Sequence, residues 1–292
     1  MKHSQIFFPF LIVAVTVCTV ESSTVSYYRH LSFNHDSPFA DYEGTDKISS
    51  DEAKSVEHYE FVCGDDGRVS EICNYSSETW RRHPLTHLGA FKTTFLYEPC
   101  RIVCRFFDKN GERVANLREV YEEDYFIDGT GFKTGLEFRD LKGDPMESDW
   151  KIARYSWEKK GNLVIERRYN LKGELVPLSP YFDFHVSGLE CDKNGHFCAH
   201  YNLDDDLNVI ANPDGIAAYT DLYSKDGRLL EITYRDKNGD IVRSPWQYAI
   251  VRLVYDKNGN VLYEDNLDAD GTFEYRMDYR YDKRGKFLPA EK

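Results

Sequence analysis

The sequence lacks several features that would assign it to a common class of protein. It has no excess of basic residues, since 37 Lys and Arg stand against 50 Asp and Glu, a formal net charge of −13. Binding to nucleic acid or to an anionic membrane needs a basic face, so the charge argues against both. No apolar run beyond the N-terminus is long enough to span a bilayer. The sequence also contains no Gly-x-Ser-x-Gly, no His-Glu-x-x-His, no phosphate loop and no dinucleotide fingerprint, so no common catalytic motif identifies it as an enzyme.

The N-terminus has the composition of a secretory leader. Lys2 and His3 precede an uncharged apolar run from Ile6 to Val17, and small and polar residues follow. A transmembrane anchor is the alternative, but a spanning helix needs about 20 apolar residues. We therefore expect residues 1–22 to be a cleaved signal peptide and the mature protein to be soluble, secreted and extracellular.

Six cysteines remain after the leader is removed, and their number indicates three disulfides in an exported chain. Proximity in the sequence favours the pairs Cys63–Cys73, Cys100–Cys104 and Cys191–Cys198. A two-residue hairpin turn at Asn194-Gly195 would place the last pair face to face, whereas a type I turn with a bulge at Gly195 would turn its sulfurs apart. Free structural thiols are the alternative, and zinc is disfavoured because no Cys-x2-Cys pair exists.

One glycosylation pattern occurs, Asn74-Tyr75-Ser76. In an exported eukaryotic protein it predicts a glycan on Asn74 and therefore an exposed loop beside Cys73.

A repeat of 32 residues dominates the chain. Residues 191–222, 223–254 and 255–286 align without gaps, and each carries two turns rich in Asp, Asn and Gly, which are residues that let the chain reverse. Apolar and polar residues alternate from Phe273 to Tyr281, which predicts a strand with one buried face. Looser copies of the repeat precede, beginning near Phe107.

These patterns predict an all-β fold, an antiparallel meander of β-hairpin repeats that forms a twisted or barrel-like sheet. One short helix is expected within Ser50 to Glu57. The expected divisions are a signal peptide (1–22), an irregular N-terminal arm that is flexible or covers an open sheet edge (23–56), a Cys-containing β segment (57–106), the repeat region (107–286) and a tail (287–292).

The C-terminal part of the chain resembles the YD-type repeats of Rhs and teneurin shells. The resemblance rests on the motif Tyr-Asp-x-x-Gly-x-Val/Leu from Tyr255 to Leu262, on the Asp-Gly turn that ends at Gly271 and on the Tyr-Asp motif that ends at Gly285. This part is also similar to variant MORN repeats of secreted bacterial proteins. The resemblance covers roughly residues 107–286 and implies β-hairpin repeats in an exported protein. It implies no catalytic residue, and the chain has far fewer repeats than an Rhs shell.

Three groups of residues are candidates for a site. Asn266, Asp268 and Asp270 fit the first half of a calcium loop, although the same residues also suit a plain hairpin turn, and no other cofactor is indicated. The segment with Trp80, Arg81, His83 and His87 interrupts the repeat and gathers the most functional side chains; solvated or hydrogen-bonded histidines are the alternative interpretation. Trp150 and Trp246 fall at comparable places in two repeats and are candidates for lining a ligand cavity, with core packing as the alternative.

Three functions remain open. The first is a secreted, disulfide-stabilised β-repeat protein that binds an extracellular ligand, small molecule or partner. The second is a secreted cofactor-free enzyme, an oxidoreductase, monooxygenase or luciferase-like protein that acts on a small aromatic substrate in a β-cavity. The third is a structural matrix protein. A deep pocket with converging His and Tyr side chains would favour the enzyme.

Overall fold

The computed structural model describes residues 23–32, 37–76, 88–179, 183–193 and 195–288. Its strands are β1 (Thr24–Leu31), β2 (Gly44–Ile48), β3 (Tyr59–Cys63), β4 (Val69–Asn74), β5 (Lys92–Glu98), β6 (Arg101–Phe107), β7 (Glu122–Ile127), β8 (Lys133–Arg139), β9 (Arg154–Lys160), β10 (Leu163–Tyr169), β11 (Val186–Cys191), β12 (Phe197–Leu203), β13 (Ala218–Tyr223), β14 (Leu229–Arg235), β15 (Ile250–Tyr255), β16 (Val261–Leu267), β17 (Phe273–Asp278), β18 (Arg280–Tyr281) and β19 (Phe287–Leu288). The one described helix, α1 (Ser50–Ala53), begins after Ser49, whose side chain accepts a hydrogen bond from the Glu52 amide. At four residues it is far too short to cross a bilayer.

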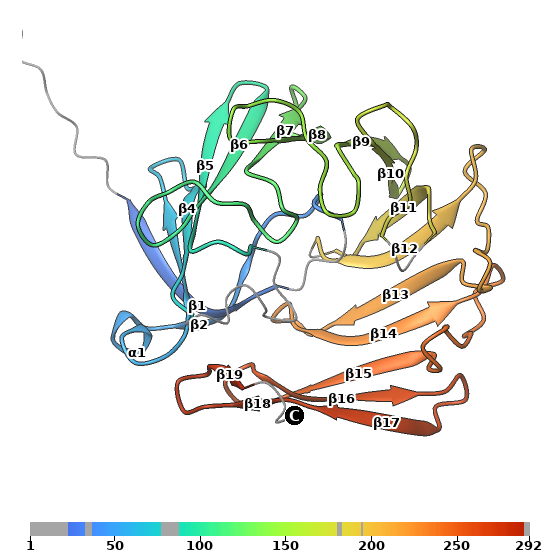
Figure 1. Cartoon of the computed structure of the whole chain (residues 1–292). Coiled ribbons are helices and arrows are strands. Elements are labelled where there is room, and N and C mark those ends of the chain that lie inside the picture. Colours follow the sequence, from blue (N-terminus) through green and yellow to red (C-terminus); the bar gives the residue numbers. More distant parts are fainter. Residues whose placement is uncertain (1–22, 33–36, 77–87, 180–182, 194, 289–292) are drawn as a thin grey trace, which may run out of the picture.

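Seventeen of the strands form one antiparallel sheet. Strand β1 pairs with both β2 and β3, and from β3 to β17 each strand pairs with the next along the chain. The strands follow one another around an open ring, and β18 and β19 form a separate hairpin (Figure 1). No pairing joins β2 to β17 among the described residues, so the sheet has two edges. The predicted all-β antiparallel meander is confirmed, and the sheet does not close into a barrel.

The looser copies share one structural feature with the regular repeats. After β6, β8, β10, β12 and β14, the chain makes a turn and returns to form a single bridge to the strand that it has just left. These bridges are Phe107–Arg113, Arg139–Pro145, Tyr169–Leu175, Leu203–Val209 and Arg235–Ile241. The bridges recur every 30 to 34 residues, so the looser copies fold like the regular ones. All of β1 to β17 belong to one sheet, and the boundary expected near residue 107 does not separate two sheets.

The hairpin turns follow the chemistry expected of Asp-x-Asn-Gly. In the turn after β15, the Gly259 amide donates to the Asp256 carbonyl (3.1 Å), and the Asp256 side chain accepts from the Asn258 and Asn260 amides (2.8 and 2.9 Å). Gly259 has φ of +83°, where a residue without Cβ is favoured. The strand register shifts by one residue beside this turn, so each such hairpin carries a bulge.

The predicted disulfides are absent, since all six cysteines, which lie in described parts of the chain, are free thiols. The bulge explains the third pair: Cys191 lies opposite Phe197 rather than Cys198, the outcome expected of the type I turn. In the first hairpin Cys63 lies opposite Val69, and Cys73 lies opposite Glu60. The register therefore separates the cysteines that proximity in the sequence had paired.

Two predictions about the chain before β5 differ from the structure. The arm expected to be irregular contains β1 and β2, whereas α1 lies within Ser50 to Glu57, where a short helix was expected. Asn74 does not lie in an exposed loop, because it is the last residue of β4 and its exposed fraction is 0%. Its side-chain oxygen accepts from the Ser76 amide (3.0 Å) and hydroxyl (2.6 Å), so the side chain is turned toward the protein instead of solvent.

Candidate binding pocket

A segment that we call the strap, Ser37–Glu43, joins β1 to β2 and crosses the inside of the ring (Figure 1). The Phe39 ring lies 5.3 Å from the Trp157 ring and 6.0 Å from the Phe197 ring, centroid to centroid. Lys133 donates from Nζ to the Phe39 carbonyl (2.7 Å) and forms an ion pair with Asp41 (2.8 Å). The strap therefore packs on the face of the sheet that carries the large buried side chains, which we call the inner face.

A buried polar cluster holds one end of the strap. The Ser37 hydroxyl donates to Glu166, and the Trp157 indole donates to the same carboxylate (2.8 Å). Arg168 pairs with Glu166 (2.5 Å) and donates to the Phe184 carbonyl (2.5 Å). The exposed fractions of Glu166 and Arg168 are both 0%, and a buried carboxylate needs such compensation. This cluster fixes the strap; it has no opening to solvent.

The other end of the strap covers a pocket of about 230 Å³. The lining residues come from the strap and from the chain between β3 and β8: Ala40, Asp41, Tyr42, Arg68, Val69, Ile72, Phe95, Tyr97, Ile102, Cys104, Tyr125 and Lys133. Tyr97, Ile102 and Tyr125 lie opposite one another on β5, β6 and β7 and form one row across the inner face. The pocket is thus built from five neighbouring strands, β4 to β8, with the strap as its cover.

Aromatic rings and two cations dominate the mouth of the pocket. Lys133 Nζ lies 4.6 Å from the centre of the Tyr125 ring, and the Arg68 guanidinium lies 4.2 Å from the centre of the Tyr97 ring. Both cations already have a carboxylate partner, since Arg68 pairs with Asp66 and Lys133 with Asp41. The mouth is therefore polar but locally neutralised, whereas the interior is apolar and aromatic.

A buried carboxylate beneath the pocket, that of Glu123, holds one of its hydroxyl groups, whereas the Tyr97 hydroxyl donates to the Val69 carbonyl (3.0 Å). The Tyr125 hydroxyl donates to Glu123 (2.8 Å), and Asn116 donates to the other oxygen of that carboxylate (2.9 Å). Arg118 approaches Glu123 at 3.7 Å. Burial, followed by the negative charge of Glu123, raises the pKa of both Tyr42 and Tyr125 far above the usual value of a phenol.

The remaining titratable groups of the pocket are shifted in the same direction. Burial raises the pKa of Tyr97 to about 12, and the pKa of the Cys104 thiol is raised well above its usual value, again chiefly by burial. All three phenols and the thiol are therefore protonated at neutral pH. They can donate hydrogen bonds, but they are poorly suited to act as bases or nucleophiles.

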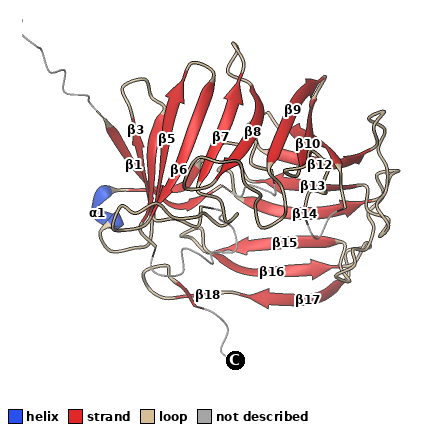
Figure 2. Ribbon diagram, turned by 45° about the horizontal axis from the view of Figure 1, so that its top comes forward, coloured by secondary structure: helices blue, strands red, loops and turns tan. Residues whose placement is uncertain are grey.

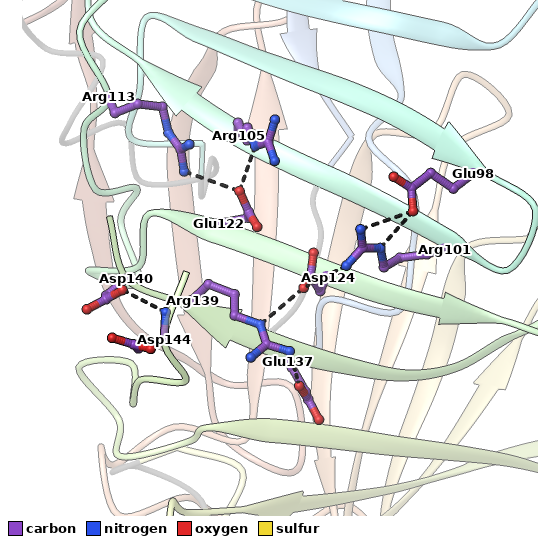
Figure 3. A network of polar contacts seen from close by, with 10 residues as sticks. All are labelled: Glu98, Arg101, Arg105, Arg113, Glu122, Asp124, Glu137, Arg139, Asp140 and Asp144. Atoms are coloured by element: carbon purple, nitrogen blue, oxygen red, sulfur yellow. Dashed lines mark hydrogen bonds and ion pairs between the residues drawn. The ribbon is translucent and has the colours of Figure 1, made fainter. Parts of the chain in front are cut away.

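The opposite face of the same strands is charged. In β7, Glu122 and Asp124 alternate with the inner-face residues Glu123 and Tyr125. Glu122 accepts from Arg105 (2.6 Å), and Asp124 accepts from Arg139 (3.1 Å) and contacts Arg101 (3.5 Å), as Figure 3 shows. This face consists of ion pairs whose arginines are partly exposed. The Asp124 carboxylate is itself buried, so removal of its arginine partners would leave a buried charge uncompensated.

The structure brings together few of the residues that the sequence suggested. Trp80, Arg81, His83 and His87 lie outside the described residues. Trp150 packs against the core cluster that contains Phe106 and Trp157, and Trp246 packs against the cluster that contains Tyr234. Both tryptophans are therefore core side chains.

The residues proposed for calcium do not form a site. Asn266 is buried in β16, with an exposed fraction of 0%, whereas Asp268 pairs with Arg243 (3.2 Å) and Asp270 accepts from the Thr272 amide (2.9 Å). No group of three His, Cys, Asp or Glu side chains suitable for a metal occurs in the described chain. The plain hairpin turn is the better interpretation.

The sequence did not single out the pocket residues Tyr42, Tyr97, Tyr125 and Lys133. One signal was present: Tyr97 and Tyr125 sit in the degenerate early copies of the repeat. The contact between the strap and β8 joins residues 92 positions apart, Asp41 and Lys133, and no local pattern reports such a contact.

No protein-family model matches the sequence, and no curated protein matches it. Among solved structures, the chain is similar to a crystal structure of TcdB2-TccC3-TEV, at 12% identity and a TM-score of 0.21, which covers 83% of this chain but only 13% of that one. It is also similar to a porin-like protein from Bacteroides uniformis, at 7% identity and a TM-score of 0.24, covering 92% of this chain and 94% of that one. These scores are too low to carry an argument about fold or function; the β-repeat architecture rests on the strand pairing described above.

Proposed function

We propose that this chain is an exported binding protein that holds a small, largely apolar aromatic molecule in the pocket between the strap and strands β4 to β8. The observation that carries the proposal is the pocket of about 230 Å³, lined by the row of Tyr97, Ile102 and Tyr125. The Tyr-Asp-x-x-Gly turns support, within the same proposal, a relation to YD-type repeats. The leader expected at residues 1–22 supports export.

The size of the pocket limits the ligand. An apolar cavity of about 150 Å³ holds a benzene molecule, so about 230 Å³ suits a bicyclic aromatic compound. Phe95 contributes an apolar ring to the lining, whereas the Tyr125 ring already contacts Lys133 and stacks on Trp157. Tyr42 and Tyr97 carry hydroxyls with raised pKa values. A flat ligand with one hydrogen-bonding group fits this chemistry better than a sugar, which would need several polar partners.

The protonated state of the pocket favours binding over catalysis. General acid–base chemistry near neutral pH needs a group whose pKa lies near neutrality. Burial moves the pKa values of Tyr97, Tyr125 and Cys104 upward, away from that range. These groups hold their protons. The Tyr125 hydroxyl donates to Glu123 and the Tyr97 hydroxyl to the Val69 carbonyl (3.0 Å), so their oxygens are the atoms left to accept a hydrogen bond from a ligand.

The test uses 1-naphthol as the probe and isothermal titration calorimetry as the measurement. For a probe of this size we expect a Kd of roughly 10–100 μM with the wild-type protein. Ile102→Trp fills the pocket from the middle of its row and should weaken binding by about tenfold or more. Leu262→Trp, which adds the same side chain at an exposed position of β16, should bind as the wild type does.

Two results would reject the proposal. One is the absence of 1-naphthol binding by the wild-type protein. The other is equal binding by Ile102→Trp and Leu262→Trp, which would place the probe elsewhere. Thermal unfolding of both variants confirms that they are folded before titration.

A further inference from the structure

Strand β17 ends the sheet, and it is open on its outer side. It lies beside β16 at the end of the sheet (Figure 2) and pairs with that strand along one edge. All six of its residues are exposed. No other described strand pairs with it. An open edge presents unpaired backbone N–H and C=O groups and is a template for a further strand.

The side chains of β17 are unusual for a free edge. The exposed fractions of Phe273 and Met277 are 55% and 46%, and that of Tyr275 is 39%. Alternation of apolar and polar residues predicts one buried face here, yet the single chain leaves that face open. The expected buried face is therefore absent, and β17 combines three exposed apolar side chains with an unpaired edge.

The charges of β17 define what kind of strand fits. Glu274, Arg276 and Asp278 alternate with the apolar residues. If a second copy of β17 pairs antiparallel about a twofold axis through Tyr275, Glu274 lies opposite Arg276 of the second copy, and the reciprocal pair forms by symmetry. Opposite charges that face each other across two strands are stabilising.

The same register matches the apolar residues. It places Phe273 opposite Met277 of the second copy and Tyr275 opposite its own equivalent, so every residue from Phe273 to Met277 has a compatible partner. A twofold axis one residue further, through Arg276, would instead oppose two arginines and place Glu274 opposite Asp278, which costs stability. The charges therefore exclude the axis through Arg276. An axis through Met277 also opposes Arg276 and Asp278, but it pairs only three residues of β17, whereas the axis through Tyr275 pairs five.

We propose that β17 pairs with β17 of a second copy of this chain and that this antiparallel pairing joins two sheets into a twofold-symmetric dimer. The contact is isologous, so it closes on itself and leaves no strand for further growth. Because each copy contributes only one six-residue strand, the interface is small, and the dimer exchanges with monomer.

Sedimentation velocity over protein concentrations from about 1 to about 200 μM tests the proposal. The wild-type protein should shift from monomer toward dimer within this range. Arg276→Glu opposes two acidic residues and should weaken the dimer by about tenfold or more. The double variant E274R/R276E restores opposite charges and should recover the wild-type dimer constant to within about threefold.

The double variant separates pairing between chains from stability within one chain. Arg276 also pairs with Asp265 (2.6 Å), and Glu274 pairs with Arg243 (2.6 Å); the double variant breaks both of these pairs, so a structural role alone predicts no rescue. Arg252→Glu is the matched control because Arg252 pairs with Glu231 inside the sheet, on β15. It should leave the dimer unchanged.

The proposal is overturned if the wild-type protein stays monomeric at every concentration, which would leave the edge to a different partner. It is equally overturned if E274R/R276E dimerises as poorly as Arg276→Glu, or if Arg252→Glu weakens the dimer to the same extent.

Discussion

The two edges of the sheet differ in how they are protected. The first edge, at β2, lies against the tips of hairpins that come much later in the chain: Asp46 pairs with Arg228, and the neighbouring His30 ring donates to the Asn258 carbonyl (3.2 Å). The last edge, at β17, has no such cover, and its residues are exposed. One sheet therefore ends in a packed edge and an open one.

The packed edge explains why the ring does not close by strand pairing. Strands β1 and β2 contact the turns that follow β13 and β15, at Arg228 and Asn258, instead of pairing with β17. The Glu57 amide also donates to the Arg284 carbonyl (2.8 Å), which brings the chain before β3 against the turn between β18 and β19. Contacts at the hairpin turns therefore hold the ring together. We expect substitutions of these turn residues to lower the free energy of unfolding most.

The largest effect should follow from substitution of Gly259, at the tip that meets β2. A Cβ there would overlap the Asp46 carboxylate and lie 2.8 Å from His30 Cδ2. Asp46 would have to move away from Arg228, so the steric and electrostatic losses add. We expect Gly259→Ala to lower the free energy of unfolding by about 3 kcal/mol or more in urea denaturation.

Gly239 provides the matched control, because it ends the same tetrapeptide, Asp-Lys-Asn-Gly, in the turn after β14. Its φ is +87°, close to that of Gly259, but a Cβ there would meet nothing within 4 Å. Gly239→Ala should therefore cost only the strain of the left-handed backbone, about 1–2 kcal/mol. Equal losses in the two variants would show that the β2 edge is not packed as described.

The ion pairs at the two edges should differ in how much they contribute to the free energy of unfolding, and this difference should be smaller than the effect at Gly259. The Asp46 side chain at the packed edge is 11% exposed and would be left without its cation in Arg228→Met. We expect a loss of about 1–3 kcal/mol. At the open edge, Arg276→Met removes a pair with Asp265 that lies closer to solvent, and the loss should be at most about 1 kcal/mol.

Urea denaturation at low protein concentration measures both losses on the monomer. A loss for Arg276→Met as large as that for Arg228→Met would contradict the difference between the edges, because it would mean that the open edge contributes as much to the fold as the packed one.

The sequence predicted the parts of the fold that depend on neighbouring residues. An Asp-x-Asn-Gly turn is stabilised within five residues, as in Asp256 to Asn260, and alternation identifies strands without reference to the rest of the chain. The antiparallel meander follows from consecutive strands joined by such turns.

The disulfide prediction was wrong although it also concerned neighbouring residues. A one-residue bulge beside the turn decides which side chains face each other, and both turn types fit the residues from Cys191 to Cys198.

The pocket could not be predicted because distant segments assemble it. Within the pocket, Lys133 pairs with Asp41 across 92 positions, and the strap that carries Asp41 is itself held by Ser37, which reaches Glu166 across 129 positions. Composition marked residues 23–56 as polar, and that observation is correct for segments such as β2, where Lys47 and Asp46 occur. It did not reveal that the apolar Phe39 in the same arm packs on the inner face, since one aromatic residue carries no periodic signal.

The smallest effect should appear in the pH dependence of the packed edge. Burial lowers the pKa of His30 below its usual value, and the nearby Asp46 carboxylate only partly opposes this shift. A histidine whose pKa is lower in the folded protein takes up its proton more readily when unfolded, so stability falls as the pH drops below about 6.5. One such group contributes at most about 1.4 kcal/mol per pH unit.

His30→Gln keeps a donor for the Asn258 carbonyl but does not titrate, so its free energy of unfolding should fall less between pH 7.5 and pH 5.5 than that of the wild type. Parallel pH profiles would mean that His30 is not buried against the hairpin tip, and the packed edge would then be as open to water as β17.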